Sequence, residues 1–150
     1  MKSKTSRFVL IALSVVFLIL TGCSDRATKA EIFALVEENR STIIENIQTC
    51  QLDNGKKISI VKETTPHDGY IDFYCGGSGM GGQTSYCGFY YFENDELENV
   101  QACLGKLIAG DHGVTFVPHG DGYVWEENDG DNMLYFEKIA DHFYYYEQKF

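Results

Sequence analysis

The chain of 150 residues has few prolines and few positive charges. It contains 2 prolines and 1 tryptophan, and 12 Lys and Arg stand against 22 Asp and Glu, for a formal net charge of −10. Binders of nucleic acid need basic surface to replace counterions, so this charge argues against a nucleic-acid partner. No internal repeat, Pro-rich linker or low-complexity tract divides the chain, which indicates a single domain.

Motifs of common catalytic and metal sites are also missing. The cysteines include no C-x-x-C pair, the histidines no H-E-x-x-H, and no serine lies in G-x-S-x-G. An EF-hand loop starting at Glu127 would have Asp129 and Asp131 as ligands, but Asn132 replaces its glycine and Lys138 its final glutamate. We therefore expect no catalysis, no metal and no cofactor, with calcium binding as a minor alternative.

The first 23 residues carry a pattern of export and lipid attachment. Lys2, Lys4 and Arg7 form a positive start, and the 13 residues from Phe8 to Leu20 form an apolar run. That run is shorter than the ~20 residues that span a bilayer as a helix, and is typical of a secretory signal. It ends in Leu20-Thr21-Gly22-Cys23, which matches the lipobox of bacterial lipoproteins at all four positions.

The segment resembles the signal peptide and lipobox of bacterial lipoproteins. The resemblance implies that residues 1–22 are removed, that Cys23 carries acyl chains such as palmitate, and that residues 23–29 form a lipidated tether to one domain, 30–150. Two or more acyl chains give stable anchoring at a membrane. Ser24 resembles the sorting signal for the outer membrane, so we expect a cell-envelope location facing the periplasm. Removing three positive charges leaves the domain with a formal charge of −13.

Four cysteines remain beyond Cys23, and an even number in an oxidising compartment predicts two disulfides with three possible connectivities. If the strands around Cys75 and Cys87 form a hairpin, both side chains point to the same face at the mouth of its loop. This favours a Cys75–Cys87 bond, and leaves Cys50–Cys103 by elimination. Each bond would stabilise the fold by ~2–4 kcal/mol. The Gly-rich sequence between Cys75 and Cys87 is then a mobile loop.

The order of hydrophobic patterns indicates an α+β fold. Apolar residues recur at three- and four-residue steps from Ala30 to Gln48, which predicts an amphipathic helix. Short runs rich in aromatic and β-branched residues, separated by Asp-Gly and similar turns, predict an antiparallel meander. These runs are 57–62, 70–75, 86–93, 114–117, 123–127, 133–139 and 142–148. We expect the helix to pack on a curved, disulfide-stapled sheet.

The segment 97–108 fits two patterns. Its apolar residues recur at helical steps, and Gly110 is a stop signal for a helix. The alternation from Val100 to Leu104 equally fits a hairpin strand, and Gly105 weakens a helix. The strand is the slightly favoured interpretation.

Acidity and an abundance of tyrosine favour binding of a protein partner. Opposite charge steers association, so a basic partner is expected. The small, acidic, Tyr-rich exported domain is similar in style to inhibitor and immunity lipoproteins, which protect bacteria from toxins or cell-wall lytic enzymes. Tyrosine is enriched at binding hot spots. The candidate contact residues are Tyr74, Tyr90, Tyr144, Tyr146, Glu126 and Asp129.

Two alternatives remain open at this level. One is an envelope-maintenance lipoprotein that binds cell wall or assembly partners through aromatic faces. The other is a module for a small ligand or calcium. A salt-sensitive complex with a basic protein would separate the first hypothesis from both.

Overall fold

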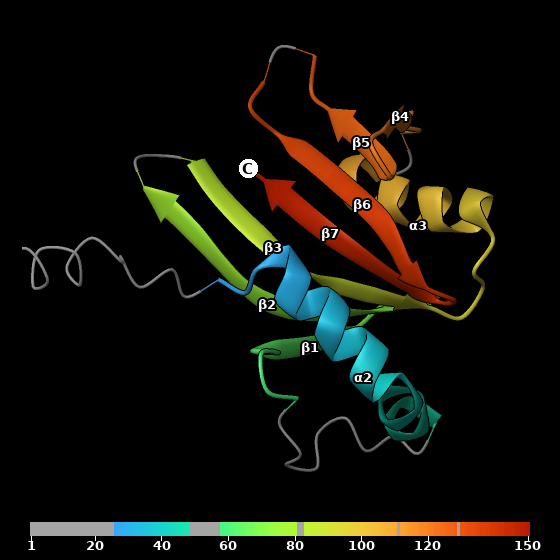
Figure 1. Cartoon of the computed structure of the whole chain (residues 1–150). Coiled ribbons are helices and arrows are strands. Elements are labelled where there is room, and N and C mark those ends of the chain that lie inside the picture. The colour runs from blue at the N-terminus through green and yellow to red at the C-terminus, as the bar shows by residue number, and fades with distance from the viewer. Residues whose placement is uncertain (1–25, 49–57, 81–82, 111, 129) are drawn as a thin grey trace, which may run out of the picture.

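Seven antiparallel strands form one sheet, and the helices of the described chain lie on its opposite faces (Figure 1). The computed structural model describes residues 26–48, 58–80, 83–110, 112–128 and 130–150. Its helices are α2 (Lys29–Gln48) and α3 (Leu97–Ala109). Its strands are β1 (Glu63–Pro66), β2 (Tyr70–Met80), β3 (Gln83–Phe92), β4 (Val117–His119), β5 (Gly122–Glu126), β6 (Met133–Ala140) and β7 (Phe143–Lys149).

The strand order β1-β2-β3-β7-β6-β5-β4 corrects the expected meander. Three strands form one half of the sheet and four form the other, and α3 connects the two halves along the chain. The halves join where β3 pairs with β7, so the last strand lies in the middle of the sheet. The run predicted at 57–62 is not a strand in its described part, 58–62, which contains a turn.

Helix α2 starts at a capping box formed by Thr28 and Glu31. The backbone N–H of Glu31 donates to the Thr28 hydroxyl (3.3 Å), and the Glu31 carboxylate accepts the N–H of Thr28 (2.8 Å). The apolar stripe of the helix then packs on one face of the sheet. Its buried members are Ile32, Leu35, Val36 and Ile43, and they meet Phe73, Phe89, Phe143 and Tyr145. The predicted N-terminal helix is confirmed.

The segment 97–108 is helical, so the favoured strand is wrong. Val100 and Leu104 of α3 are fully buried on the face of the sheet opposite α2. Gly105 serves this packing: a Cβ there would lie 3.1 Å from the Val114 side chain. The helix ends at Gly110, whose positive φ of 60° suits glycine. Its backbone N–H donates a hydrogen bond to the carbonyl of Lys106.

Because a helix covers each face, the aromatic strand β7 is core on both sides. Phe143 and Tyr145 lie under α2, whereas Tyr144 and Tyr146 lie on the α3 side, and all four are at most 4 % exposed. Tyr144 and Tyr146, which were expected to contact a partner, are therefore part of the core.

The disulfide prediction is also wrong for the described cysteines, since Cys75, Cys87 and Cys103 are free thiols. Cys75 and Cys87 do share the face under α2, but a bulge between Tyr74 and Gly76 takes Cys75 out of register and sets Gly76 opposite Cys87. The two thiols lie near separate carbonyls, of Phe73 (3.5 Å) and Ala27 (3.3 Å). Cys50 lies outside the described residues.

The described part of the Gly-rich sequence, residues 76–80 and 83–86, is not a loop, because β2 and β3 continue through it. Gly77, Ser78 and Gly79 pair with Tyr86, Ser85 and Thr84 in regular register. The residues 1–25, with the signal segment and Cys23, lie outside the described part of the chain. Within that part, no helix has the length and apolar character needed to cross a membrane.

Candidate functional site

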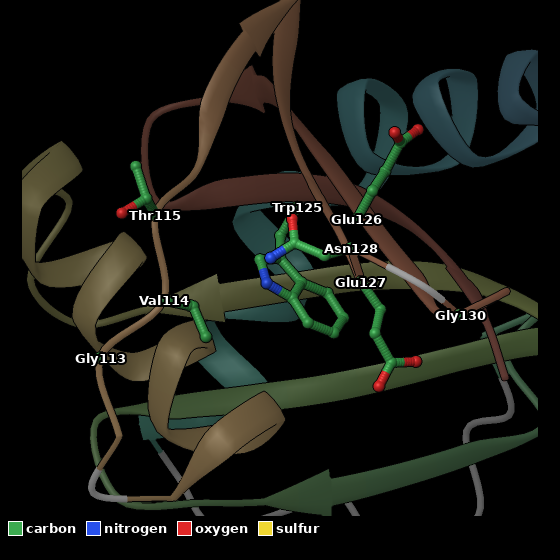
Figure 2. A pocket seen from close by; sticks show the side chains of 8 residues that line it. All are labelled: Gly113, Val114, Thr115, Trp125, Glu126, Glu127, Asn128 and Gly130. Carbon is green, nitrogen blue, oxygen red and sulfur yellow. The ribbon is translucent and has the colours of Figure 1, made fainter.

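An open pocket of about 650 Å³ lies at one end of the sheet, on the α3 side (Figure 2). One wall is the segment 113–115 that follows α3. The other is formed by the end of β5 and by described residues between β5 and β6, namely 125–128 and Gly130. Sites for small groups and side chains are typically concave, with a few well-placed polar groups, so this hollow is the first candidate.

Trp125, the one tryptophan of the chain, forms the centre of the pocket. It lies opposite Leu134 in the register of β5 and β6, and its half-buried side chain packs against the core under α3. Figure 2 shows the indole between Val114 on one side and Glu127 on the other. A fixed aromatic surface therefore remains accessible at the pocket.

Two glutamates directly follow Trp125 in the chain. Glu126 and Glu127 are exposed, and neither takes part in an ion pair within the described chain. The Glu127 carboxylate accepts a hydrogen bond from Asn132 Nδ2 (2.8 Å) and lies close against Gly130. The Glu126 carboxylate points away from the indole in Figure 2, and it also lines a second hollow on the α2 side.

This arrangement suits a cationic side chain. A guanidinium or ammonium group over the face of tryptophan gains ~0.5–1 kcal/mol at an exposed site, and more when water is excluded. A carboxylate such as that of Glu127 adds a charge-assisted hydrogen bond. Because Asn132 and the tight turn hold Glu127 in place, less side-chain entropy is lost on binding.

The second hollow, of about 410 Å³, lies on the other face of the sheet beside the start of α2. Its floor includes Tyr135 and Tyr145, and its rim includes His119, Asp121 and Lys149. His119 meets the Tyr135 ring edge-on, with 6.1 Å between centroids. Donors, acceptors and a partly exposed ring occur together in this hollow.

Beneath the second hollow, two Tyr–Glu pairs alternate across the neighbouring strands β6 and β7. The Tyr135 hydroxyl donates to Glu137 and the Tyr145 hydroxyl to Glu147, while Tyr135 lies opposite Glu147 in the sheet register. Burial, with the hydrogen bond to the neighbouring carboxylate next, raises the pKa of both phenols. These hydroxyls therefore stay protonated and donate to the carboxylates.

The N-terminal segment places a cation on each carboxylate. Arg26 binds Glu147 at 2.6 Å, and the Lys29 ammonium pairs with Glu137. The ammonium also lies 5.4–5.7 Å from the ring centroids of Phe33, Tyr135 and Tyr145. These contacts fasten the start of α2 to the sheet, so both carboxylates serve the fold itself.

Three of the six predicted contact residues are buried in the structure. Tyr90, Tyr144 and Tyr146 are 0 %, 4 % and 1 % exposed, and they belong to the core under α3. Tyr74 is half-buried beside Tyr86, with 6.1 Å between ring centroids. These side chains support the sheet, and the first three are not accessible to a partner.

Of the two predicted acidic contact residues, Glu126 lines the pocket, whereas Asp129 lies outside the described residues. Sequence reasoning missed Trp125, although a single tryptophan directly before two glutamates at the end of a predicted strand was a usable signal. Its exposure depends on the path of the segment 113–115, which no local pattern shows.

No protein-family model, curated protein or solved structure matches this chain. Within the described residues, no group of three or more His, Cys, Asp or Glu side chains is placed to hold a metal ion.

Proposed function

We propose that this chain is a lipid-anchored lipoprotein of the bacterial envelope whose domain binds a basic protein, without catalysis, through the Trp125 pocket. The observation that carries the proposal is the accessible indole beside the Glu127 carboxylate, which has no cationic partner in the described chain. The lipobox ending at Cys23 supports the anchor. An inhibitor or immunity protein against a toxin or lytic enzyme fits both features.

The distribution of charge supports a basic partner. Four of the chain's cations, Arg26, Lys29, Arg40 and Lys138, are in ion pairs with its own carboxylates. Glu126 and Glu127 remain free to meet cations of another molecule. An acidic surface speeds encounter with a basic protein, and an exposed aromatic anchor supplies affinity at short range.

The test uses the soluble domain from Ser24 as bait for envelope and culture-fluid proteins at low and high salt, with basic lysozyme and cytochrome c as defined probes. A specific basic partner should bind at low salt and weaken at high salt. Trp125→Ala and Glu127→Gln should each weaken the complex about tenfold or more, as for a hot spot worth ~1.4 kcal/mol or above. Glu38→Gln, an exposed change on α2, should leave it intact.

Folding and affinity are separated by measuring the melting temperature of each variant. Trp125→Phe keeps an aromatic ring and should retain part of the affinity. Equal binding by wild type, Trp125→Ala and Glu127→Gln would show that the pocket is not the binding site. Equal capture of lysozyme and cytochrome c with no variant effect would show only non-specific charge attraction.

A second candidate, envelope maintenance by binding cell-wall glycan, is favoured by the hollow beside Tyr135. There a partly exposed ring lies near hydrogen-bonding groups of both kinds, which suits a hydroxyl-rich ligand. A pull-down on insoluble cell wall tests it. Binding lost in Asp121→Asn but retained in Trp125→Ala would favour this candidate over the first.

A further inference from the structure

The β2–β3 hairpin extends beyond its neighbour strand at one end of the sheet. β1 pairs with β2 only as far as Tyr74, whereas β2 and β3 remain paired to Met80 and Gln83. In Figure 1 the green hairpin runs past the start of α2. Its end is supported on the other side, since Thr84 and Phe150 exchange backbone hydrogen bonds of 2.8 and 3.0 Å.

This hairpin end differs from the rest of the domain in charge. Residues 76–85 contain no charged side chain, although the domain carries 22 acidic residues. A depression of about 500 Å³ lies there, lined by Ser78, Gly79, Gln83, Thr84, Ser85 and Lys149. Lys149 is exposed and has no ion pair within the described chain. Hydroxyl and amide donors around a free ammonium suit a phosphate group.

The proposed anchor lies close to the same end. Arg26 donates to Ser85 (2.9 Å) and to Glu147 (2.6 Å), and the N–H of Ala27 donates to the carbonyl of Cys75 (3.2 Å). The described chain begins at Arg26, which is three residues after Cys23. Three residues reach about 10 Å at most, so acyl chains on Cys23 would hold this end against the lipid.

We propose that the hairpin end and Lys149 lie on the headgroup layer of the membrane that anchors Cys23, with Lys149 contacting lipid phosphate. This inference rests on the lipid anchor in the proposed function. Anionic lipid repels an acidic domain and attracts a basic residue that lies near the surface. A short tether therefore favours an orientation in which the uncharged hairpin end and Lys149 face the membrane.

The test places a fluorophore on the full lipidated protein in vesicles of phosphatidylethanolamine and phosphatidylglycerol that carry nitroxide headgroups. The labelled positions are Gln83→Cys, at the hairpin end, and Asp141→Cys, in the exposed turn at the opposite end of the sheet. Cys50 and Cys103 are replaced by Ser. Burial raises the pKa of the Cys75 thiol to about 12 and also raises that of Cys87, so both stay unlabelled.

Quenching should be several-fold stronger at position 83 than at position 141. Lys149→Gln should reduce the quenching of the label at position 83. The matched change Lys106→Gln on α3 should leave that quenching unchanged. Equal quenching at positions 83 and 141 would refute the hairpin contact. Quenching at position 83 that is as strong in Lys149→Gln as in the protein with Lys149 would refute the phosphate contact. Acyl mass and membrane fractionation, with Cys23→Ser as the soluble control, are measured first. Absence of the wild type from membranes would refute the anchor and, with it, this placement.

Discussion

Asp72→Asn should stabilise the domain at neutral pH. Asp72 lies on β2, on the α3 side of the sheet, where it accepts a hydrogen bond from the fully buried Tyr146 hydroxyl at 2.9 Å. Burial raises the pKa of this carboxyl from 3.8 to about 6, the Glu63 carboxylate adds to the rise, and the Tyr146 hydrogen bond opposes it. The ionised form is therefore costly in the folded state.

The sign and size of this cost follow from proton linkage. Between about pH 4 and pH 6 the folded state binds more protons than the unfolded state, so the free energy of unfolding falls as the pH rises. A difference of about two pKa units corresponds to roughly 3 kcal/mol as an upper value. Asparagine keeps the oxygen that accepts from Tyr146 but carries no charge, so it removes the cost.

Urea unfolding of the soluble domain measures the effect. At about pH 7.5 the variant should be more stable by up to roughly 3 kcal/mol, a midpoint shift of about 1–2 M, and the difference should shrink towards zero near pH 4. Asp68→Asn, an exposed change in the turn between β1 and β2, should show no such trend. A variant Asp72→Asn that is equally or less stable at every pH would refute the argument.

Three further predictions concern packing, thiols and the N-terminal contacts. Gly88→Ala should cost about 1–3 kcal/mol in thermal unfolding, because its Cβ would lie 2.3 Å from the Phe73 carbonyl, while Gly113→Ala, with open space, should be neutral. With Cys50 and Cys103 replaced by Ser, the native domain from Ser24 should show no reactive thiol. Unfolded without reductant, it should show two reactive thiols, those of Cys75 and Cys87. No reactive thiol in the unfolded domain would mean that Cys75 and Cys87 form a disulfide. Arg26→Gln should cost about 1–2 kcal/mol, whereas the exposed Arg40→Gln should cost under about 0.5; equal losses would contradict the role of Arg26 in fastening α2.

Several elements could be predicted because their cause is local. The helix expected from Ala30 to Gln48 is α2, since its stripe repeats with the helical period and Thr28 with Glu31 starts it. The runs 133–139 and 142–148 correspond to β6 and β7 within a residue or two, because aromatic and β-branched residues favour strands. Neighbours along the chain are enough to define such elements.

The misplaced elements depended on contacts between distant segments. The segment 97–108 had two acceptable local patterns, and the need to cover the second face of the sheet selected the helix α3. Cys75 and Cys87 shared a face as expected, but spacing along the chain does not show a bulge, and the bulge separated them in register. The tyrosines of β7 alternate as expected, yet which face is covered is decided by α3.

By itself the sequence determined the charge of the domain, the lipobox pattern at Cys23, the helix α2 and most strands, because these depend on composition and on neighbours within a few residues. The tertiary structure alone decided that β3 meets β7, that the thiols are free and that Trp125 faces an open pocket. Each of these depends on register and packing between segments tens of residues apart, where small shifts in backbone position change which side chains meet.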